Sequence, residues 1–374
     1  MTRPAAGCCI ELPMNKPEVE IFRFHSRTLR DFAAEILLRF GLPDSHARVV
    51  GDSLVASNLR GVDSHGLLLL AGYIQRLRAG GIDGKATGKV AFESGACLLY
   101  DGQNGLGQVV AERCADHAVR LAAASSLGMV VARNSNHFGA AAFWSERMAR
   151  AGCIGITMSS AGIVVPPWQG KSPRIGTNPI AMAAPESGAG RWLLDMATTT
   201  VANGRIANAA DYHRMAIPAE WRFVDRDARP TTDRREAERG WPEPVGGYKG
   251  SGLAMMAEIL CAVLSGGPMS TETVVDPKGA VPIRISHTFL AIDPKRFLAP
   301  GEFESRMARL VSMIKSSEPA PGYDEVLVAG EPEWREEAVR SREGIPIPAP
   351  LWERLSAIAG QVQVVPPQPD ATAR

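Results

Sequence analysis

Short apolar runs alternate with amphipathic helical segments through the middle of this chain. Each run has four or five residues between turn residues, which is typical of strands that are buried on both faces. Segments with helical periodicity occupy several of the intervals. This alternation predicts an α/β fold. The expected strands are 96–100, 129–132, 154–158, 180–184 and 288–292, and the expected helices between them are 108–122, 140–151 and 251–264.

Helical segments also occupy both ends of the chain. Apolar residues recur at helical spacing in 26–41, 44–59 and 67–79, and again in 333–342 and 350–359. We therefore expect helical N-terminal and C-terminal portions around the α/β region. The stretch 225–244 is charged and contains proline without an apolar period, so we expect an exposed excursion there.

The charge balance excludes one large class of partner. Lys and Arg number 41 while Asp and Glu number 40, so the net charge is +1 and no basic excess attracts nucleic acid. The apolar stretch 253–264 is too short to span a membrane. The first 17 residues lack the apolar core of a signal peptide, and six cysteines are scattered without metal-ligand spacing. We therefore expect a cytoplasmic protein with reduced thiols, no membrane contact and no metal.

The glycine fingerprint of dinucleotide-binding domains is absent from the sequence. Gly-x-Gly-x-x-Gly normally joins a strand to a helix and lets a pyrophosphate reach the helix N-terminus. The stretches 102–107 and 246–252 have the wrong glycine spacing, and Lys249 is not followed by the Ser or Thr of a phosphate-binding loop. A dinucleotide site in this chain must therefore be unconventional.

Two segments place a histidine where a helix is expected to begin. RNSNHFG (133–139) follows the strand 129–132, and VDSHG (62–66) precedes the helix 67–79. His137 and His65 are candidates for proton transfer near neutral pH, and the amides around His137 suit an anion. In the alternative interpretation, Asn136, Asp63 or Ser64 caps a helix and both histidines are structural. Spacing alone leaves both interpretations open.

Three further segments carry polar groups beside expected strands or helices. Lys249 stands among four glycines before 251–264, where it either reaches a phosphate or ribose or is a solvated loop lysine. Asp195, in LDMATTT (194–200), either accepts from ribose hydroxyls or caps the segment that follows. Thr177, in GTNP (176–179), precedes the strand 180–184.

The order of these segments is more specific than any one of them. RGVDSHG, SNHFG, GTNP, LDMATTT, GGYKGSGLAMM, FLAIDP and REGIPIP follow one another between about residues 24 and 359. Together they resemble the malate/L-lactate dehydrogenase family of the non-Rossmann type. This family also includes ureidoglycolate and sulfolactate dehydrogenases, diketogulonate reductases and Δ1-piperideine-2-carboxylate reductases. The resemblance implies a homodimer with a family-specific α/β fold that binds NAD or NADP and exchanges hydride with a 2-oxo acid, 2-hydroxy acid or cyclic imino acid.

The resemblance also assigns roles to residues. His137 matches the proton-transferring histidine of ureidoglycolate-type members, and Thr177 matches a substrate-side position. Members that reduce cyclic imines use instead the histidine matching His65, with the serine matching Ser64 and an aspartate where this chain has Arg205. The missing aspartate favours hydroxy acids over imines. The expected cofactor contacts are His137, Phe138, Gly139, Asp195, Met196, Ala197 and Lys249.

A second departure concerns the substrate carboxylate. Many relatives have an arginine at the position of Leu69, where a guanidinium grips the carboxylate in a bidentate fork. Either Arg76, Arg60 or Arg174 takes over that grip, or the substrate lacks a carboxylate there, or activity has drifted. The stretch 283–287 also replaces a glycine-containing segment of relatives, which alters part of the expected cofactor contact.

We therefore expect an NAD(P)-dependent oxidoreductase that acts on a 2-hydroxy acid or 2-oxo acid. His137 or His65 supplies the proton, while Ser64, Tyr73 and Arg76 orient the substrate. The alternatives are a Δ1-pyrroline or Δ1-piperideine-2-carboxylate reductase, and a cofactor-binding relative that has lost turnover. The expected parts are a tail (1–20), an N-terminal helical and substrate-side region (21–115), a cofactor-binding α/β region (116–300), a C-terminal helical region that packs back on the N-terminal part (301–360) and a tail (361–374).

Overall fold

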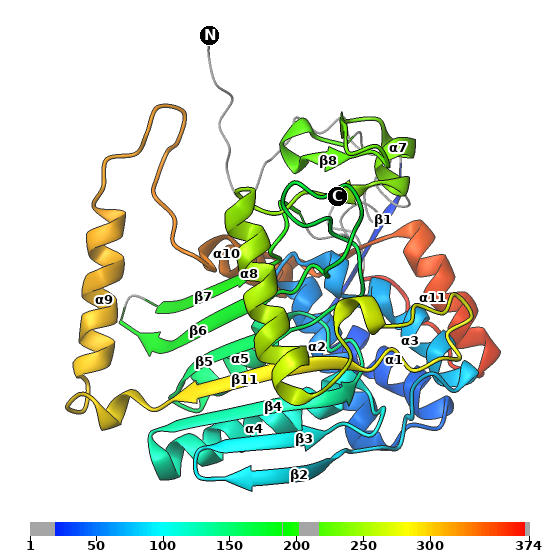
Figure 1. Ribbon diagram of the computed structural model, residues 1–374. Helices are drawn as coiled ribbons and strands as arrows, with labels where there is room; N and C mark the ends of the chain where they lie inside the picture. Colours follow the sequence, from blue (N-terminus) through cyan, green and yellow to red (C-terminus); the bar gives the residue numbers. More distant parts are fainter. Residues whose placement is uncertain (1–18, 189, 202–216, 371–374) are drawn as a thin grey trace.

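The computed structural model describes residues 19–188, 190–201 and 217–370. Its centre is a seven-stranded mixed sheet with the strand order β2-β3-β4-β11-β5-β6-β7 (Figure 1). The predicted α/β class is confirmed, and each of the five expected strands is present. The strands are β2 (Lys89–Ser94), β3 (Cys97–Asp101), β4 (Leu127–Ser135), β5 (Ile154–Ser159), β6 (Ile180–Ser187), β7 (Gly190–Met196) and β11 (Ile285–Ile292).

Strand β11 decides the topology of the sheet. β3 and β4 pair in parallel and are joined by the helix α4 (Gly107–Ser125), which makes one crossover unit. β11 lies between β4 and β5 and is antiparallel to both. β4 and β5 therefore run in the same direction without pairing, and β6 and β7 continue the sheet in antiparallel order. The alternation of strands and helices thus produces a mixed sheet and not a parallel one.

Helices enclose both faces of the sheet (Figure 1). α4 and α5 (Ala141–Arg150) contact each other and pack on one face. α8 (Tyr248–Glu258) continues as a π-helical turn, η5 (Ile259–Val263), and covers β11, β4 and β5 on the other face. Ala257 and Cys261 pack there against Met158. Because both faces are covered, the central strands carry the continuous apolar runs that the sequence shows.

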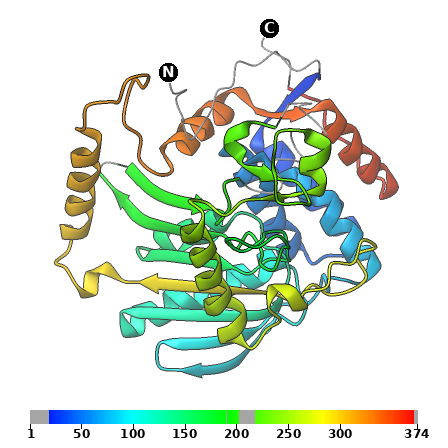
Figure 2. The same ribbon diagram turned by 45° about the horizontal axis from the view of Figure 1, so that its top comes forward.

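The two ends of the chain form one helical layer beside the sheet (Figure 2). α1 (Ser26–Arg39), α2 (Asp44–Leu59) and α3 (Leu70–Ala79) precede the sheet, and α10 (Glu331–Glu343) and α11 (Ala349–Gln361) follow it. α10 packs on α2, and α11 packs on α3. β1 (Ile21–Phe24) pairs antiparallel with β12 (Ile345–Pro348). Phe24 and Trp352 fix this joint, since their ring centroids lie 4.2 Å apart.

A small three-stranded sheet occupies much of the charged stretch 225–244, and the sequence analysis did not predict it. Its strands are β8 (Phe223–Val224), β9 (Pro230–Thr231) and β10 (Trp241–Pro242). The short helix α7 (Arg234–Arg239) begins where Asp233 accepts a hydrogen bond from the amide of Glu236 at 3.0 Å. Most side chains of the stretch are exposed. Short helical turns elsewhere are η4 (Ala219–Trp221), η6 (Ser270–Glu272) and η7 (Pro294–Arg296).

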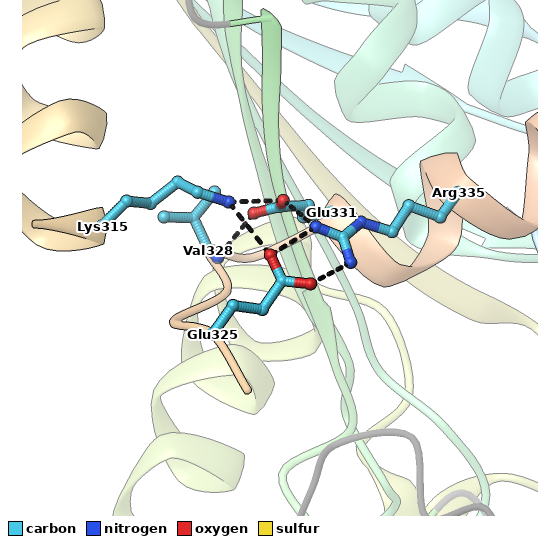
Figure 3. Close-up of polar contacts among 5 residues, drawn as sticks. All are labelled: Lys315, Glu325, Val328, Glu331 and Arg335. Atoms are coloured by element: carbon cyan, nitrogen blue, oxygen red, sulfur yellow. Dashed lines mark hydrogen bonds and ion pairs between the residues drawn. The ribbon is translucent and has the colours of Figure 1, made fainter. Parts of the chain in front are cut away.

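A network of ion pairs attaches the peripheral helix α9 (Glu302–Lys315) to α10 (Figure 3). Lys315 and Arg335 both bind Glu331, at 2.5 and 2.6 Å, and Arg335 also binds Glu325. Glu331 accepts a further hydrogen bond from the amide of Val328 at 3.2 Å. An exposed ion pair contributes little alone, but side chains that share partners are already ordered for the next contact. The network therefore holds the loop after α9 against the start of α10.

The last described residues pack against the protein. Val364 is buried, and the amide of Asp370 donates to the carbonyl of Arg23 at 2.8 Å. Residues 1–18 of the expected N-terminal tail, residues 371–374 and Arg205 lie outside the described residues. Within the described ranges, no helix is both long enough and apolar enough to cross a membrane.

Candidate active site

The loop between β4 and α5 is held in place by the start of α4. A Cβ atom at Gly107 would meet the carbonyl oxygens of Asn136 and His137 at 2.2 and 2.3 Å, so only glycine permits this approach. The buried side chain of Asn136 donates to two carbonyl oxygens of the turn before α4, at 2.8 and 3.1 Å. Asn136 thus anchors the loop and does not cap α5, whose N-cap residue is Ala140. His137 is presented by fixed backbone.

Four of the predicted site residues meet in front of this loop. The Tyr73 hydroxyl, from α3, lies 2.7 Å from His137 Nδ1. His65 belongs to the short helical turn η1 (Asp63–His65), and its ring centroid is 5.8 Å from that of His137 at an interplanar angle of 26°. The Ser64 hydroxyl lies 3.0 Å from His65 Nδ1. Segments far apart in the sequence therefore build one cluster of hydrogen-bonding side chains.

Two contacts define which nitrogen of neutral His137 carries the proton. The amide of Gly139 donates to His137 Nδ1 at 3.3 Å, and an amide N–H can only donate. Nδ1 is therefore an acceptor, and the Tyr73 hydroxyl is the donor in the shorter bond. The ring proton then resides on Nε2, which is the nitrogen left for a ligand.

Burial favours the neutral form of each of these groups. It lowers the pKa of His65 to about 4 and raises the pKa of the Tyr73 phenol. Desolvation, followed by the imidazoles of His65 and His287, also lowers the pKa of His137. The side chain of His137 is itself exposed, which leaves its ring accessible to a ligand. A carboxylate bound nearby raises the pKa of both histidines.

The turn that carries His65 is anchored by Asp63. Arg340, from α10, binds Asp63 Oδ1 at 2.7 Å, and the Asn58 side chain donates to the same oxygen at 2.6 Å. Asn58 also accepts from the amide of Leu67 at 2.9 Å. A Cβ at Gly66 would meet the Asn58 side chain at 2.2 Å, which explains the glycine. Asp63 therefore binds an arginine and an amide group and does not cap the following helix.

Arg76 is the arginine that lies next to the histidine cluster. Its Nη2 is 3.4 Å from Asn136 Oδ1 and 3.2 Å from the carbonyl of Val281. Burial lowers its pKa, the charge of Asp276 opposes this shift, and no carboxylate lies within ion-pair distance of it in the described part of the chain. Of the other two candidates, Arg60 lies near Asp195 and Arg174 is exposed. Leu69, in η2 (Leu67–Leu69), packs against the main apolar core.

The expected cofactor residues lie beside the start of α5. Asp195, near the end of β7, accepts a hydrogen bond from the amide of Ala142 in the first turn of α5 at 3.0 Å. Desolvation by the surrounding protein raises the pKa of Asp195 to about 6, while this hydrogen bond and the charge of Arg60 oppose the rise. Met196 and Ala197 follow and are partly exposed.

Hydrogen bonds connect the segment 194–200 to the segment that contains Thr177 and to the one that contains Lys249. Thr198 donates to the carbonyl of Thr177 from its amide at 2.9 Å and from its hydroxyl at 2.8 Å. The carbonyl of Thr198 in turn accepts from the amide of Val245 at 3.0 Å. This bond brings the turn that precedes Lys249 against the same segment. Lys249 itself is exposed in the first turn of α8, and its contacts among the described residues do not include the histidines.

A model of the malate/L-lactate dehydrogenase family matches residues 24–356. The chain belongs to this family. It is 35% identical to a malate dehydrogenase of Pyrococcus horikoshii over 90% of this chain and 94% of the relative. The solved structure titled malate dehydrogenase from that organism superposes with a TM-score of 0.86, at 33% identity over 94% of this chain and 99% of the other.

Two further relatives differ in their named substrates. An L-sulfolactate dehydrogenase of Methanocaldococcus jannaschii is 36% identical over 88% of this chain and 94% of its own length. A ureidoglycolate dehydrogenase (NAD(+)) of Escherichia coli is 31% identical over 88% of this chain and 93% of its own length. The family membership therefore identifies the chain as a hydroxy-acid dehydrogenase-like enzyme. It does not define which hydroxy acid is the substrate.

The sequence analysis assigned no role to His287, which lies in β11 behind the loop between β4 and α5. His287 is fully buried in β11, and its ring stacks on Phe138 with centroids 4.4 Å apart and an interplanar angle of 7°. Its Nε2 lies 3.1 Å from the carbonyl of Asn136, which fixes the proton on Nε2, and Ser159 Oγ lies 2.9 Å from Nδ1. His287 therefore supports the backbone that presents His137. Phe138 points into the core, so only its backbone is open to a cofactor.

We predict that His287 makes the fold sensitive to acid. Burial lowers its pKa to about 3 from 6.5, so the unfolded chain binds the proton more tightly and stability falls as pH drops below about 6.5. Each such group contributes up to about 1.4 kcal/mol per pH unit to the slope of the unfolding free energy. His287→Gln should therefore flatten that slope in urea unfolding between about pH 7 and 5, with His25→Gln, at an exposed position, as the control. Parallel slopes in wild type and His287→Gln would contradict the prediction.

Proposed function

We propose that this chain is an NAD(P)-dependent oxidoreductase that interconverts a 2-hydroxy acid and the corresponding 2-oxo acid. The contact between Tyr73 and His137 Nδ1, beside Arg76, carries the proposal. It leaves one imidazole nitrogen free near a guanidinium that forms no ion pair within the described ranges and is influenced by the charge of Asp276 from a greater distance. A 2-hydroxy acid offers the two groups that this pair fits, an oxygen that exchanges a proton and a carboxylate.

The residues on the other side of the loop fit a nicotinamide dinucleotide. α5 starts after Ala140, and the carboxylate of Asp195 lies at this helix N-terminus, where it binds the first-turn amide of Ala142. The carboxylate of Asp195 suits ribose hydroxyls, and the ammonium of Lys249 suits a phosphate. We propose that these residues, with Met196, Ala197 and the backbone of 137–139, hold NAD or NADP. When bound, the nicotinamide gives hydride to the substrate carbon or takes it away.

His137 handles the substrate proton in this proposal. In the direction of reduction, the imidazolium donates its Nε2 proton to the carbonyl oxygen and keeps the proton on Nδ1. The Tyr73 oxygen then accepts from Nδ1, because a hydroxyl can turn from donor to acceptor. In the direction of oxidation, the neutral ring first moves its proton to Nδ1, which donates to the Tyr73 oxygen, so that Nε2 is free to take the hydroxyl proton. His65, with Ser64, stacks beside this ring and hydrogen-bonds the same substrate oxygen or its neighbour.

Arg76 grips the substrate carboxylate in place of the arginine that Leu69 replaces. Its guanidinium is ordered by carbonyl oxygens of Gly81 and Val281, which leaves it charged and pre-positioned. The arriving carboxylate also raises the pKa of His137 toward neutrality, so substrate binding itself favours the proton-donating form.

A reductase for Δ1-pyrroline-2-carboxylate or Δ1-piperideine-2-carboxylate is the second candidate. The 3.0 Å contact between Ser64 and His65 favours it, since this pair is the one expected in imine-reducing members. Competing the cyclic imine against pyruvate-like acids separates the two activities. A relative that binds cofactor without turnover is the third candidate, and Leu69→Arg should then restore reduction of a 2-oxo acid.

We further propose that the chain forms a homodimer through α8 and η5. The outward side of these helices carries a patch of solvent-exposed apolar side chains. It consists of Met255, Met256, Ile259, Val263 and Leu264. Contiguous exposed apolar patches typically mark association sites in soluble proteins. The resemblance to a family of homodimers agrees with a second copy as the occupant.

The proposed activity predicts loss of turnover in His137→Asn. Removing a general acid and base slows the chemical step by about 100-fold to 10,000-fold, and His65→Asn should also lower kcat. Purified protein is assayed with malate, lactate and sulfolactate and with either NAD+ or NADP+, by following absorbance of the reduced cofactor. His117→Asn, at a partly exposed position outside the cluster, is the control. Wild-type turnover in both the His137 and His65 variants would exclude the assignment.

Arg76→Leu should raise the KM for the hydroxy acid by about 100-fold, because a charged hydrogen bond to a carboxylate contributes about 1.5–3 kcal/mol. The KM for the cofactor should stay within about threefold. Arg78→Leu, on another face of the same helix, is the matched control. If Arg76→Leu left both KM values unchanged, another group would bind the carboxylate.

Ile259→Glu should convert the homodimer into a monomer, because it places a charge at the centre of the apolar patch. Light scattering during size-exclusion chromatography measures the mass. Phe297→Glu, at an apolar side chain outside the patch that is more exposed than Ile259, should remain dimeric. A monomeric wild type, or a dimeric Ile259→Glu variant, would remove this interface.

A further inference from the structure

Neither polar atom of the buried Gln108 side chain makes a hydrogen bond of normal geometry with a described residue. It lies in the first turn of α4, its side chain is 0% exposed, and neither its amide oxygen nor its amide nitrogen is bonded within the described residues. Native proteins pair the large majority of buried polar groups, because an unpaired one loses its hydration without compensation. A fully buried amide with two unpaired atoms therefore needs a functional or solvent explanation.

Gln108 lies directly beneath the loop that presents His137. Its neighbour Gly107 touches the backbone of that loop, and its amide nitrogen is 4.0 Å from where a Cβ at Gly139 would stand. The amide is also close enough to the Tyr73 hydroxyl to lower the pKa of that phenol, against the larger effect of burial. The nearby hydroxyl of Ser53 is already committed to the carbonyl of Val50 at 2.9 Å.

The Tyr73 hydroxyl is the group near Gln108 whose bonding is incomplete. When His137 is neutral, the Tyr73 O–H points at Nδ1 and a lone pair of its oxygen is free. When His137 is protonated, Nδ1–H points at the Tyr73 oxygen, and the Tyr73 O–H needs another acceptor. An amide is suited to both states, because it carries a donor and an acceptor at the end of one side chain.

We propose that Gln108 is a positioning residue that supports both orientations of the Tyr73 hydroxyl. Its amide N–H donates to the Tyr73 oxygen when His137 is neutral, and its amide oxygen accepts from the Tyr73 O–H when His137 is protonated. Small side-chain rotations that accompany ligand binding bring either bond to full geometry, as catalytic hydrogen bonds often tighten in the complex. The catalytic part of this inference rests on the proposed function, whereas the hydrogen bonding does not.

Two different substitutions of Gln108 should shift the pKa of His137 in opposite directions. Gln108→Met removes the acceptor that the Tyr73 O–H needs when His137 is charged, and a buried unpaired donor costs more than an unfilled lone pair. The pKa of His137 should therefore fall. Gln108→Glu offers an acceptor and a negative charge, so the pKa should rise. The titratable groups that face His137 are His65, His287 and Tyr73, and they are the same in both variants.

The decisive measurement is an NMR titration of 15N-labelled histidine in the full-length protein, with the His137 signals assigned by His137→Asn. We expect a downward shift of at least about 0.5 pH units in Gln108→Met and an upward shift in Gln108→Glu. In the Tyr73→Phe background, Gln108→Met should have no further effect, because the two side chains act through one contact. Gln103→Leu, in the exposed turn before the same helix, is the control.

Kinetics provide the second measurement. Gln108→Met should lower kcat by about 10-fold or more with KM within threefold, and should move the alkaline limb of the kcat/KM profile for reduction to lower pH. An unchanged His137 titration in Gln108→Met would overturn the proposal and assign a buried water to the amide. If Gln108→Met does not fold, Gln108→Glu is titrated instead, alone and together with Tyr73→Phe. An unchanged pKa of His137 in Gln108→Glu would then overturn the proposal. Absence of any turnover in wild type would reject the proposed function, while the titration would still test Gln108.

Discussion

The contact between Gly107 and the backbone of Asn136 and His137 is the constraint on which the site depends. Any side chain at position 107 would push α4 away from the loop, because the obstructing atoms are backbone carbonyl oxygens and cannot rotate aside. The approach also carries Gln108 beneath the loop and lets Asn136 reach the turn before α4. The absence of a Cβ at position 107 therefore sets the positions of three side chains, those of His137, Gln108 and Asn136.

The site lies where the sheet meets the helical layer, and each contributes a different kind of group. The sheet side supplies His137 on a loop that Asn136 and His287 hold rigidly. The helical layer supplies Tyr73 and Arg76 from one side of α3 and His65 from the turn before it. Rigid support on both sides suits proton transfer, because the donor and acceptor atoms must keep hydrogen-bond distance as charge moves.

Much of the fold could be predicted because its causes are local in the sequence. The central strands are apolar on both faces and stand out as continuous runs, whereas every side chain of the edge strand β2 is exposed, so no apolar pattern marks it. β1 and β12 are four residues each, and only their distant partner makes them strands. The motifs around His65 and His137 were found, but Asn136 and Asp63 were also weighed as helix caps. Their actual partners come from other segments, which no local rule supplies.

The roles of His287 and Gln108 lay beyond sequence reasoning for a related physical reason. Each is a polar residue within an apolar segment, and its function depends on which distant groups surround it once buried. Arg76 was one of three candidate arginines, and its position beside Asn136 follows from the packing of α3, not from its spacing.

The salt bridge between Arg340 and Asp63 has a consequence for how the enzyme comes into being. Asp63 holds the turn of His65, yet its arginine follows it by 277 residues in the chain. A nascent chain can form the sheet and expose both imidazoles well before this anchor exists. The turn of His65 therefore acquires its anchor only after every strand of the central sheet has been synthesised.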